Sequence, residues 1–248
     1  MDENDIPKVI NYCWFGNNPK SLLIIKCINS WKKYFPDYKI IEWNEKNFNI
    51  NINKYVSDAY KNKKWAFVSD YARIWIIYNY GGFYFDTDVE VIKNFENENG
   101  FLNGFFCIEN KMIATGLGFA TKKGDIILKQ ILDFYDKTNF INKDGSLNLT
   151  TCVLANNYVF ENAFGLISKI NLKTQINGYT IFPNEYFCPL NYVTGELVKT
   201  QNTVAIHWYG ASWLTKKQKF INKLKIIIRN IIGNKSFENI KNKIKRKE

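Results

Sequence analysis

Several features that would narrow the function of this 248-residue chain are missing from it. No run of about 18 apolar residues is present, so we expect no transmembrane helix. The first ten residues, MDENDIPKVI, carry acids where a signal peptide carries lysines, and no apolar core follows them. Together these absences predict a protein that is made and kept in the cytoplasm.

Cysteine and histidine are also scarce. The five cysteines are scattered, odd in number and without a CxxC pair, which argues against a disulfide framework or a zinc knuckle. We therefore expect them to be reduced packing residues. The chain has a single histidine, His207, in the segment VAIHWYGASW. A lone histidine beside apolar residues is often a core residue, and it can also be a metal ligand.

Charge is unevenly distributed along the chain. The net charge is +11, yet residues 216–248 hold twelve basic and two acidic residues and so account for +10 of it. The rest of the chain is nearly neutral, with enough apolar and aromatic residues for a packed core. We expect a folded domain over residues 1–215 and a separate basic tail over 216–248.

Hydrophobic spacing predicts an α/β fold. Strands alternate with helices in the first half of the chain, which is typical of a sheet with crossover connections. Ser69 or Asp70 is a candidate N-cap for the third helix, and Gly81 is its candidate stop. The expected helices are residues 21–34, 69–81 and 125–137. The expected strands are residues 8–14, 39–43, 83–91 and 104–110, with short β segments near 179–183 and 203–209.

The most apolar segment, WAFVSDYARIWIIYNYGGFYFDTDVEV, contains charged residues. It holds the pair Asp70 and Arg73 on one helical face, and it holds Asp86 and Asp88 one residue apart. In a strand the two aspartates would project to the same side, where paired carboxylates suit Mg²⁺ or Mn²⁺. A solvated turn and an ordinary intrahelical salt bridge would explain the same residues. Their joint presence in an aromatic segment favours a polar site.

These residues resemble a known family. The stretch SDYARIWIIYNYGGFYFDTD is similar to the signature of the DXD glycosyltransferases of family 32, which include bacterial capsule and surface-polysaccharide transferases. Golgi mannosyltransferases and the large glucosylating toxins are related to this group. The resemblance extends through IPKVINYCWFGNNPK, SWKKYFPDYKIIEWNE, TGLGFA and IHWYGASW, from about residue 6 to 215.

The resemblance implies a GT-A fold, with a Rossmann-like nucleotide-binding sheet and a smaller acceptor-side part. It implies that Trp14 stacks on the base of the donor, although a core tryptophan would fit that position too. Asp70 and Arg73 match the pair that contacts the donor sugar and the leaving phosphate. Asp86 would contact ribose and sugar hydroxyls or reach the metal through water, and Asp88 would ligate the metal. Tyr84 belongs to the same donor-binding set.

The C-terminal part of the resemblance implies further contacts. His207 would be a metal ligand, while Ser212 and Trp213 would contact the diphosphate when a loop made mobile by Gly210 closes. The segment TGLG, residues 115–118, is a tight turn that either lets the backbone approach the acceptor or the sugar, or is only a turn. The implied reaction is a retaining hexosyl transfer that uses Mn²⁺ or Mg²⁺. Its donor is a nucleotide-diphosphate sugar, which we expect to be UDP-linked, and its acceptor is a glycan or lipid-linked oligosaccharide. No residue is assigned to the acceptor.

The tail contains a predicted amphipathic helix. Its apolar stripe is Phe220, Ile221, Leu224, Ile227, Ile228, Ile231 and Ile232. Such a helix would lie on an anionic membrane surface, which makes the protein peripheral on the cytoplasmic face. It could instead pack on the domain. Nucleic-acid binding is not expected, because no aromatic residues are interleaved with the tail lysines.

We therefore expect a metal-dependent glycosyltransferase of surface-polysaccharide synthesis. A non-catalytic nucleotide-sugar or carbohydrate-binding module would bind the donor without turnover. A membrane-surface adaptor would depend on the tail and not on Asp88.

Overall fold

The computed structural model describes residues 5–96, 103–150, 152–165, 167–210, 216–233 and 236. The chain divides into two compact units, one of residues 1–189 with 199–208 and one of residues 190–198 with 209–248. The first unit holds both sheets and every residue of the site described below. The boundary near residue 215 that the charge pattern suggests stays a prediction.

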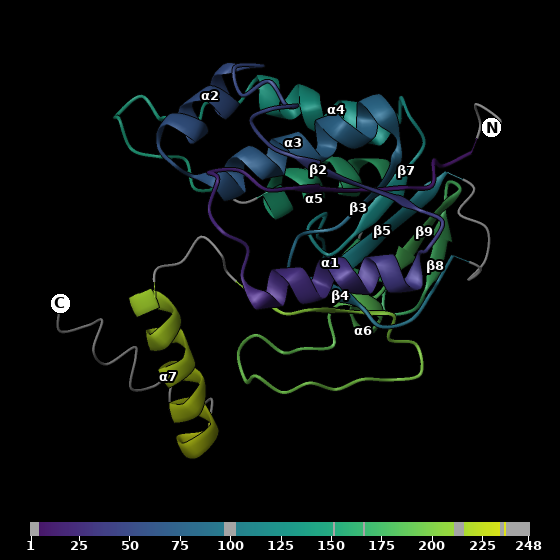
Figure 1. The fold of residues 1–248 in the computed structure, drawn as a ribbon, viewed down its shortest axis with the longest axis vertical. Coiled ribbons are helices and arrows are strands. Elements are labelled where there is room, and N and C mark those ends of the chain that lie inside the picture. The colour runs from purple at the N-terminus through teal and green to yellow at the C-terminus, as the bar shows by residue number, and fades with distance from the viewer. Residues whose placement is uncertain are drawn as a thin grey trace. The chain divides into compact units, whose positions relative to one another are not determined.

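The first unit is built on a mixed sheet, which confirms the α/β class (Figure 1). Its strand order is β2-β1-β3-β7-β5-β9-β8, with β6 paired to β5. The strands β2, β1 and β3 are parallel, whereas β7 runs antiparallel to β3 and β5. The bounds are β1 Val9–Cys13, β2 Lys39–Trp43, β3 Gly82–Tyr84, β5 Gly104–Glu109, β6 Met112–Ile113, β7 Phe119–Thr121, β8 Thr174–Ile176 and β9 Tyr179–Phe182. A separate antiparallel pair joins β4 Val89–Val91 to β10 Ala205–His207.

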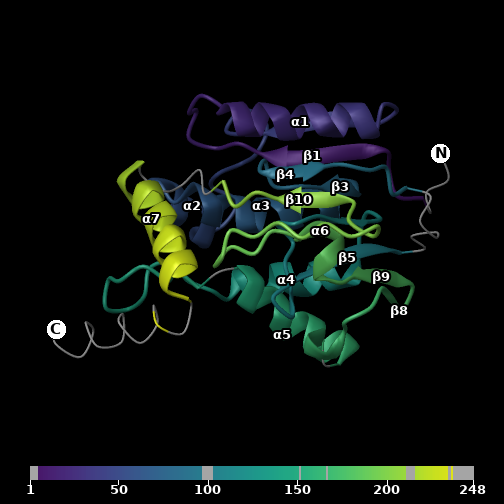
Figure 2. The same cartoon turned by 90° about the horizontal axis from the view of Figure 1, so that it is seen from below.

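Helices cover the central sheet on both faces (Figures 1 and 2). The helix α3 packs against β1, β3 and β7, and α1 lies against β4. In β3, Phe83 meets Phe35 of α1, while Tyr84 on the other face meets Arg73 of α3. The bounds are α1 Leu22–Tyr34, α2 Lys54–Lys61, α3 Trp65–Tyr80, α4 Ile126–Asp136, α5 Cys152–Phe164, a 3₁₀ turn Ile167–Lys169, α6 Asn184–Phe187 and, in the second unit, α7 Lys216–Ile232.

Local signals explain where several of these helices begin and end. The Ser21 side chain accepts from Ile24 N at the start of α1, and the Asp125 side chain accepts from Ile127 N and Leu128 N at the start of α4. The Gly81 N–H donates to Ile77 O at the end of α3, with φ at 68°, where glycine is favoured. These ends agree with the sequence-based expectations.

The predicted N-cap of α3 is wrong. The helix begins at Trp65, one turn before Ser69 and Asp70, and Lys64 stands at its N-cap. The Trp65 ring packs against Tyr60 at a centroid distance of 4.9 Å, and this contact supports the added turn. Asp70 lies inside the helix, where its carboxylate faces Arg73.

The predicted single strand over residues 83–91 is also wrong. The chain leaves the central sheet after Tyr84 and turns at Thr87 and Asp88, where Val89 N donates to Asp86 O. It then pairs with β10 in the second sheet. The helices α2 and α5 were not predicted, because their polar residues interrupt the apolar spacing.

All five cysteines are buried and free of disulfide bonds, as expected. Among the described residues, no helix combines the length and the apolar character needed to cross a membrane.

Candidate functional site

The parallel strands β1 and β3 bring two predicted site residues to the same edge of the sheet. Asn11 of β1 pairs with Tyr84 of β3, so both strands end together. Trp14 follows β1 directly, and Asp86 lies two residues beyond β3. In an open α/β sheet, the carboxyl ends of the strands are the usual place for ligands.

The centre of the site is a cluster of Asp70 and Arg73, which are buried, and Asp86, whose side chain is 29% exposed. Arg73 Nη2 lies 2.9 Å from Asp70 Oδ1 and 3.2 Å from Asp86 Oδ1. Arg73 Nε donates to Ser69 O, which orients the guanidinium along α3. The Tyr84 hydroxyl donates to Asp86 Oδ1 at 2.9 Å, and the Tyr84 ring lies under the guanidinium at 5.2 Å. Arg73 therefore pairs with two carboxylates, and Tyr84 contacts both Arg73 and Asp86.

Burial sets the electrostatics of this cluster. Burial first, and then the neighbouring Asp88 carboxylate, raise the pKa of Asp86 to about 6 against the lowering effect of the Arg73 charge. Burial also raises the pKa of Asp70, which Arg73 and the thiol and N–H of Cys152 counteract. For Arg73, burial alone would lower the pKa, but the nearby groups, Asp86 first, raise it well above the usual value. The guanidinium is thus a permanent cation.

The TGLG segment takes part in the site through Gly116. Asp86 N donates to Gly116 O, which brings the two backbones together. A Cβ on Gly116 would lie 2.4 Å from Asp86 Oδ2 and 3.0 Å from Arg73 Nη1. Thr115 beside it accepts from Asn156 of α5 at 2.9 Å. A side chain at residue 116 would therefore displace the carboxylate.

Asp88 lies beside the only histidine. The strand pairing places His207 opposite Val89, and Trp208 N donates to Asp88 O. His207 Nε2 is 3.5 Å from Asp88 Oδ1. Burial would lower the pKa of His207, but Asp88 raises it well above the usual value. Carboxylate oxygens suit Mn²⁺ or Mg²⁺, and the structure brings the Asp88 carboxylate beside His207. Asp86, Asp88 and His207 do not gather as one group of potential metal ligands among the described residues, so the predicted ligand set stays a prediction.

His207 has a second set of neighbours that the sequence did not reveal. Potential ligand atoms of Glu109, Cys188 and His207 all lie within 4.8 Å of one another. The three residues stand in different parts of the chain, so no motif could have joined them.

Trp14 is half-buried at the strand edge. Its Nε1 donates to Asn18 O at 2.7 Å, and Lys20 Nζ lies 5.6 Å from the ring centroid. Gly16 follows with φ at 87°, and a Cβ there would lie 2.5 Å from Trp65 Nε1. The loop after β1 is therefore tightly held. The predicted diphosphate contacts Ser212 and Trp213 lie outside the described residues.

Cys152 is a site neighbour that sequence reasoning missed. It is the first residue of α5, and its free N–H and thiol approach Asp70. Arg73 Nη1 lies 3.9 Å from its sulfur. No sequence signal indicated this role, because a lone cysteine in an apolar context is also expected of an ordinary packing residue.

Residues 22–104 match the family model described as "Glycosyltransferase sugar-binding region containing DXD motif". The matched segment includes Asp70, Arg73, Asp86 and Asp88. No curated protein matches the chain. This region and its DXD motif support a glycosyltransferase.

Solved structures of glycosyltransferases are similar to this chain. One is "PaToxG Glycosyltransferase", which is 18% identical over 63% of this chain and 69% of its own, with a TM-score of 0.51. Another is a glycosyltransferase involved in the glycosylation of the major capsid of PBCV-1. It is 13% identical over 88% of this chain and 100% of its own, with a TM-score of 0.49. The chain has the α/β GT-A glycosyltransferase fold that the sequence predicts.

Proposed function

We propose that the protein is a metal-dependent, retaining glycosyltransferase of the family 32 type. It would transfer a hexose from a nucleotide-diphosphate sugar, expected to be UDP-linked, to a glycan or lipid-linked acceptor in surface-polysaccharide synthesis. The observation that carries this proposal is the cluster of Asp70, Arg73 and Asp86 with Asp88 and His207 beside it. A chain does not bury so many charges cheaply without a ligand to bind.

Asp86, Asp88 and His207 would hold the metal, for which Mn²⁺ is our first choice. When bound, a divalent cation supplies positive charge against the charge that develops on the leaving diphosphate. Asp86 is held by Arg73 and Tyr84, whereas Asp88 contacts His207 from the turn. Asp88 is therefore the better direct ligand, and Asp86 the better partner for sugar and ribose hydroxyls.

The remaining residues would bind and orient the donor. The cation of Arg73 faces the site between two carboxylates and would stabilise the leaving phosphate electrostatically. Trp14 would stack on the base, and Asp70 would accept hydrogen bonds from sugar hydroxyls. Ser212 and Trp213 would close over the diphosphate. No separate general base is assigned, because in a retaining transfer the departing diphosphate can accept the proton of the acceptor hydroxyl.

The decisive test is hydrolysis of a panel of UDP- and GDP-hexoses with Mn²⁺. We expect turnover with at least one donor, loss of turnover after chelation, and recovery when Mn²⁺ is returned. Asp88→Asn should remove turnover without changing the thermal unfolding midpoint, while the exposed control Asp37→Asn should behave as wild type. Full activity of Asp88→Asn would refute the assignment. Donor binding without turnover in the wild type would favour a non-catalytic binding module.

We also propose that the basic tail places the enzyme on the cytoplasmic face of a membrane. The described apolar side chains of the predicted stripe on α7 are exposed, including Leu224, Ile227 and Ile231. Such a stripe flanked by cations would insert into an anionic surface, where each cation contributes about 1 kcal/mol. The full chain should sediment with phosphatidylglycerol vesicles and not with phosphatidylcholine vesicles. Equal behaviour with both, or none with either, would favour packing of the tail on the protein.

A further inference from the structure

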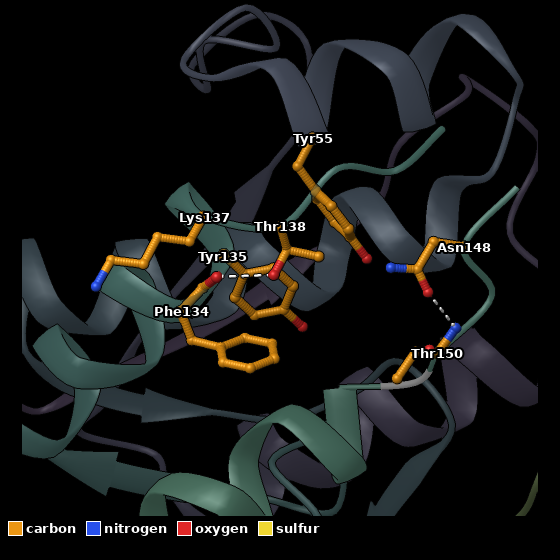
Figure 3. A pocket seen from close by; sticks show the side chains of 7 residues that line it. All are labelled: Tyr55, Phe134, Tyr135, Lys137, Thr138, Asn148 and Thr150. Atoms are coloured by element: carbon orange, nitrogen blue, oxygen red, sulfur yellow. Dashed lines mark hydrogen bonds between the residues drawn. The ribbon is translucent and has the colours of Figure 1, made fainter. Parts of the chain in front are cut away.

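A cavity of about 330 Å³ lies between α2, α4 and the segment that leads to α5 (Figure 3). Three aromatic side chains, Tyr55, Phe134 and Tyr135, form much of its wall. Polar residues of the 137–150 segment complete it, among them Lys137 and Thr138. Its volume is at the lower end of the roughly 300–1,000 Å³ of small-molecule sites. It has room for a ligand of about one sugar ring.

Two hydroxyls in this cavity lack a partner. Tyr55 and Tyr135 are each only 3% exposed. Figure 3 shows their hydroxyls directed into the space beside Phe134 and Asn148. Among the described residues, neither hydroxyl makes a hydrogen bond. Neither hydroxyl oxygen is among the fully buried polar atoms that lack a partner, so both face the open space of the cavity and are available to a ligand that brings polar groups.

Some of the other polar groups of the cavity bind the protein's own backbone, and others can still bind a ligand. Asn148 Nδ2 donates to Asn139 O, and its Oδ1 accepts from Thr150 N, so this side chain holds its own loop. The Thr138 hydroxyl donates to Phe134 O at 2.8 Å, and its oxygen can still accept a hydrogen bond from a ligand. Together with the two tyrosine hydroxyls, Thr138 offers the short, varied hydrogen bonds that sugar hydroxyls require, beside aromatic faces that suit sugar C–H groups.

The cavity borders the charged cluster. The charge of Asp70 acts on both Tyr55 and Tyr135, as does the thiol of Cys152. Thr150 on the cavity wall stands two residues before Cys152, whose N–H and thiol approach Asp70. Asp88 and His207 contact each other, and their charges act on Asp86, which is bound to Arg73 and through it to Asp70. Ion pairs thus join Asp86 through Arg73 to Asp70, and both cavity tyrosines lie close enough to Asp70 to feel its charge.

We propose that this cavity binds a hexose ring of the acceptor, next to the donor sugar held at Asp70 and Arg73. The inference rests on the proposed glycosyltransferase function and assigns its acceptor side. The donor's diphosphate would lie with Asp86, Asp88 and His207, at the other end of these ion pairs from Asp70. An acceptor must reach the donor sugar from the side that the diphosphate leaves open, and Tyr55 and Tyr135 border that side.

The test uses full-length Tyr55→Phe and Tyr135→Phe, which keep each ring and remove one hydroxyl. The matched control is Tyr80→Phe, an exposed tyrosine of α3. Saturation-transfer NMR with the methyl glycosides of glucose, galactose, mannose and N-acetylglucosamine measures binding directly. We expect at least one glycoside to bind the wild type and Tyr80→Phe, with affinity about fivefold weaker in either cavity variant, as one lost hydrogen bond implies.

Two activity measurements separate this inference from the proposed function. Donor hydrolysis without acceptor should stay within about twofold of wild type in both cavity variants, while transfer to the bound glycoside weakens with its affinity. A wild type that hydrolyses no donor refutes the proposed function, and glycoside binding then still decides the cavity. The cavity assignment is overturned if no glycoside binds, if binding is equal in all variants, or if the variants lose donor hydrolysis as strongly as transfer.

Discussion

Two groups of largely buried polar side chains lie beside α3, and they differ in how their hydrogen-bonding capacity is used. In the cluster of Asp70, Arg73 and Asp86, the charges are paired with each other and with Tyr84. In the cavity, the hydroxyls of Tyr55 and Tyr135 have no partner among the described residues. The side chains of the first group are paired with one another, whereas the two hydroxyls of the second group pair with no described residue and are open to a ligand.

This difference predicts opposite responses to mutation. Removing one member of a fully hydrogen-bonded buried network leaves the other members buried without a partner, which lowers the stability of the fold. Removing a hydroxyl that pairs with no described residue breaks no hydrogen bond within the protein and leaves the packing of the ring intact. Stability measurements can therefore distinguish residues that the fold needs from residues kept for binding.

The largest effect is expected from Arg73→Met, which leaves Asp70 and Asp86 without their cation. Loss of one partner from a buried ion network costs about 3–5 kcal/mol of unfolding free energy. Urea denaturation followed by circular dichroism measures it. Lys129→Met is the control, because Lys129 pairs with Asp133 on the surface of α4 and should change stability little. Equal effects of the two substitutions would show that the cluster is not a network.

Gly116→Ala should impair activity more than stability. Its Cβ would lie 2.4 Å from Asp86 Oδ2, so the carboxylate must move. Displacement of a reacting group by about 1 Å can cost a hundredfold in rate, while overpacking costs about 1–3 kcal/mol. Gly124→Ala is the control, because it has open space but a φ of 77°, and it should lose stability without losing donor hydrolysis. An active Gly116→Ala enzyme would exclude Asp86 from the site.

A pair of tyrosine substitutions compares satisfied and unsatisfied hydroxyls directly. Tyr179 donates to Asp125 Oδ2 at 2.6 Å, so Tyr179→Phe should cost about 1–2 kcal/mol. Tyr135→Phe should leave the unfolding free energy nearly unchanged. Both values come from the same denaturant titration. A cost for Tyr135→Phe equal to that of Tyr179→Phe would indicate a structural hydrogen bond at Tyr135.

The smallest effect concerns Glu42 at the edge strand β2. Burial alone would raise the pKa of Glu42, but hydrogen bonds from Lys20, Tyr12 and Asn44 lower it below its usual value of 4.5. A lowered folded-state pKa contributes stability above pH 4.5 that is lost as the pH falls through the folded value. Glu42→Gln should therefore lose less stability than wild type on acidification below pH 4.5. The difference should be small, because this group is well solvated, and parallel acid-dependence curves would contradict the shift.

Much of the local structure follows from short-range physics that a sequence displays. The spacing of apolar residues placed α1 and α4, and Gly81 marked the end of α3. The presence of several charged residues within one apolar segment identified four candidate site residues, Asp70, Arg73, Asp86 and Asp88. These signals are readable because each depends on residues close together in the chain.

The sequence by itself determined the α/β class, the charge asymmetry of the tail and the charged residues of the core segment. Only the tertiary structure decided that Asp86 and Asp88 flank a turn, that Gly116 touches Asp86, and that Cys152 approaches Asp70. It alone brought Tyr55 and Tyr135 to one cavity from separate helices. The physical reason is that contacts between distant segments depend on how sheet and helices pack, and neither spacing nor composition encodes which faces will meet.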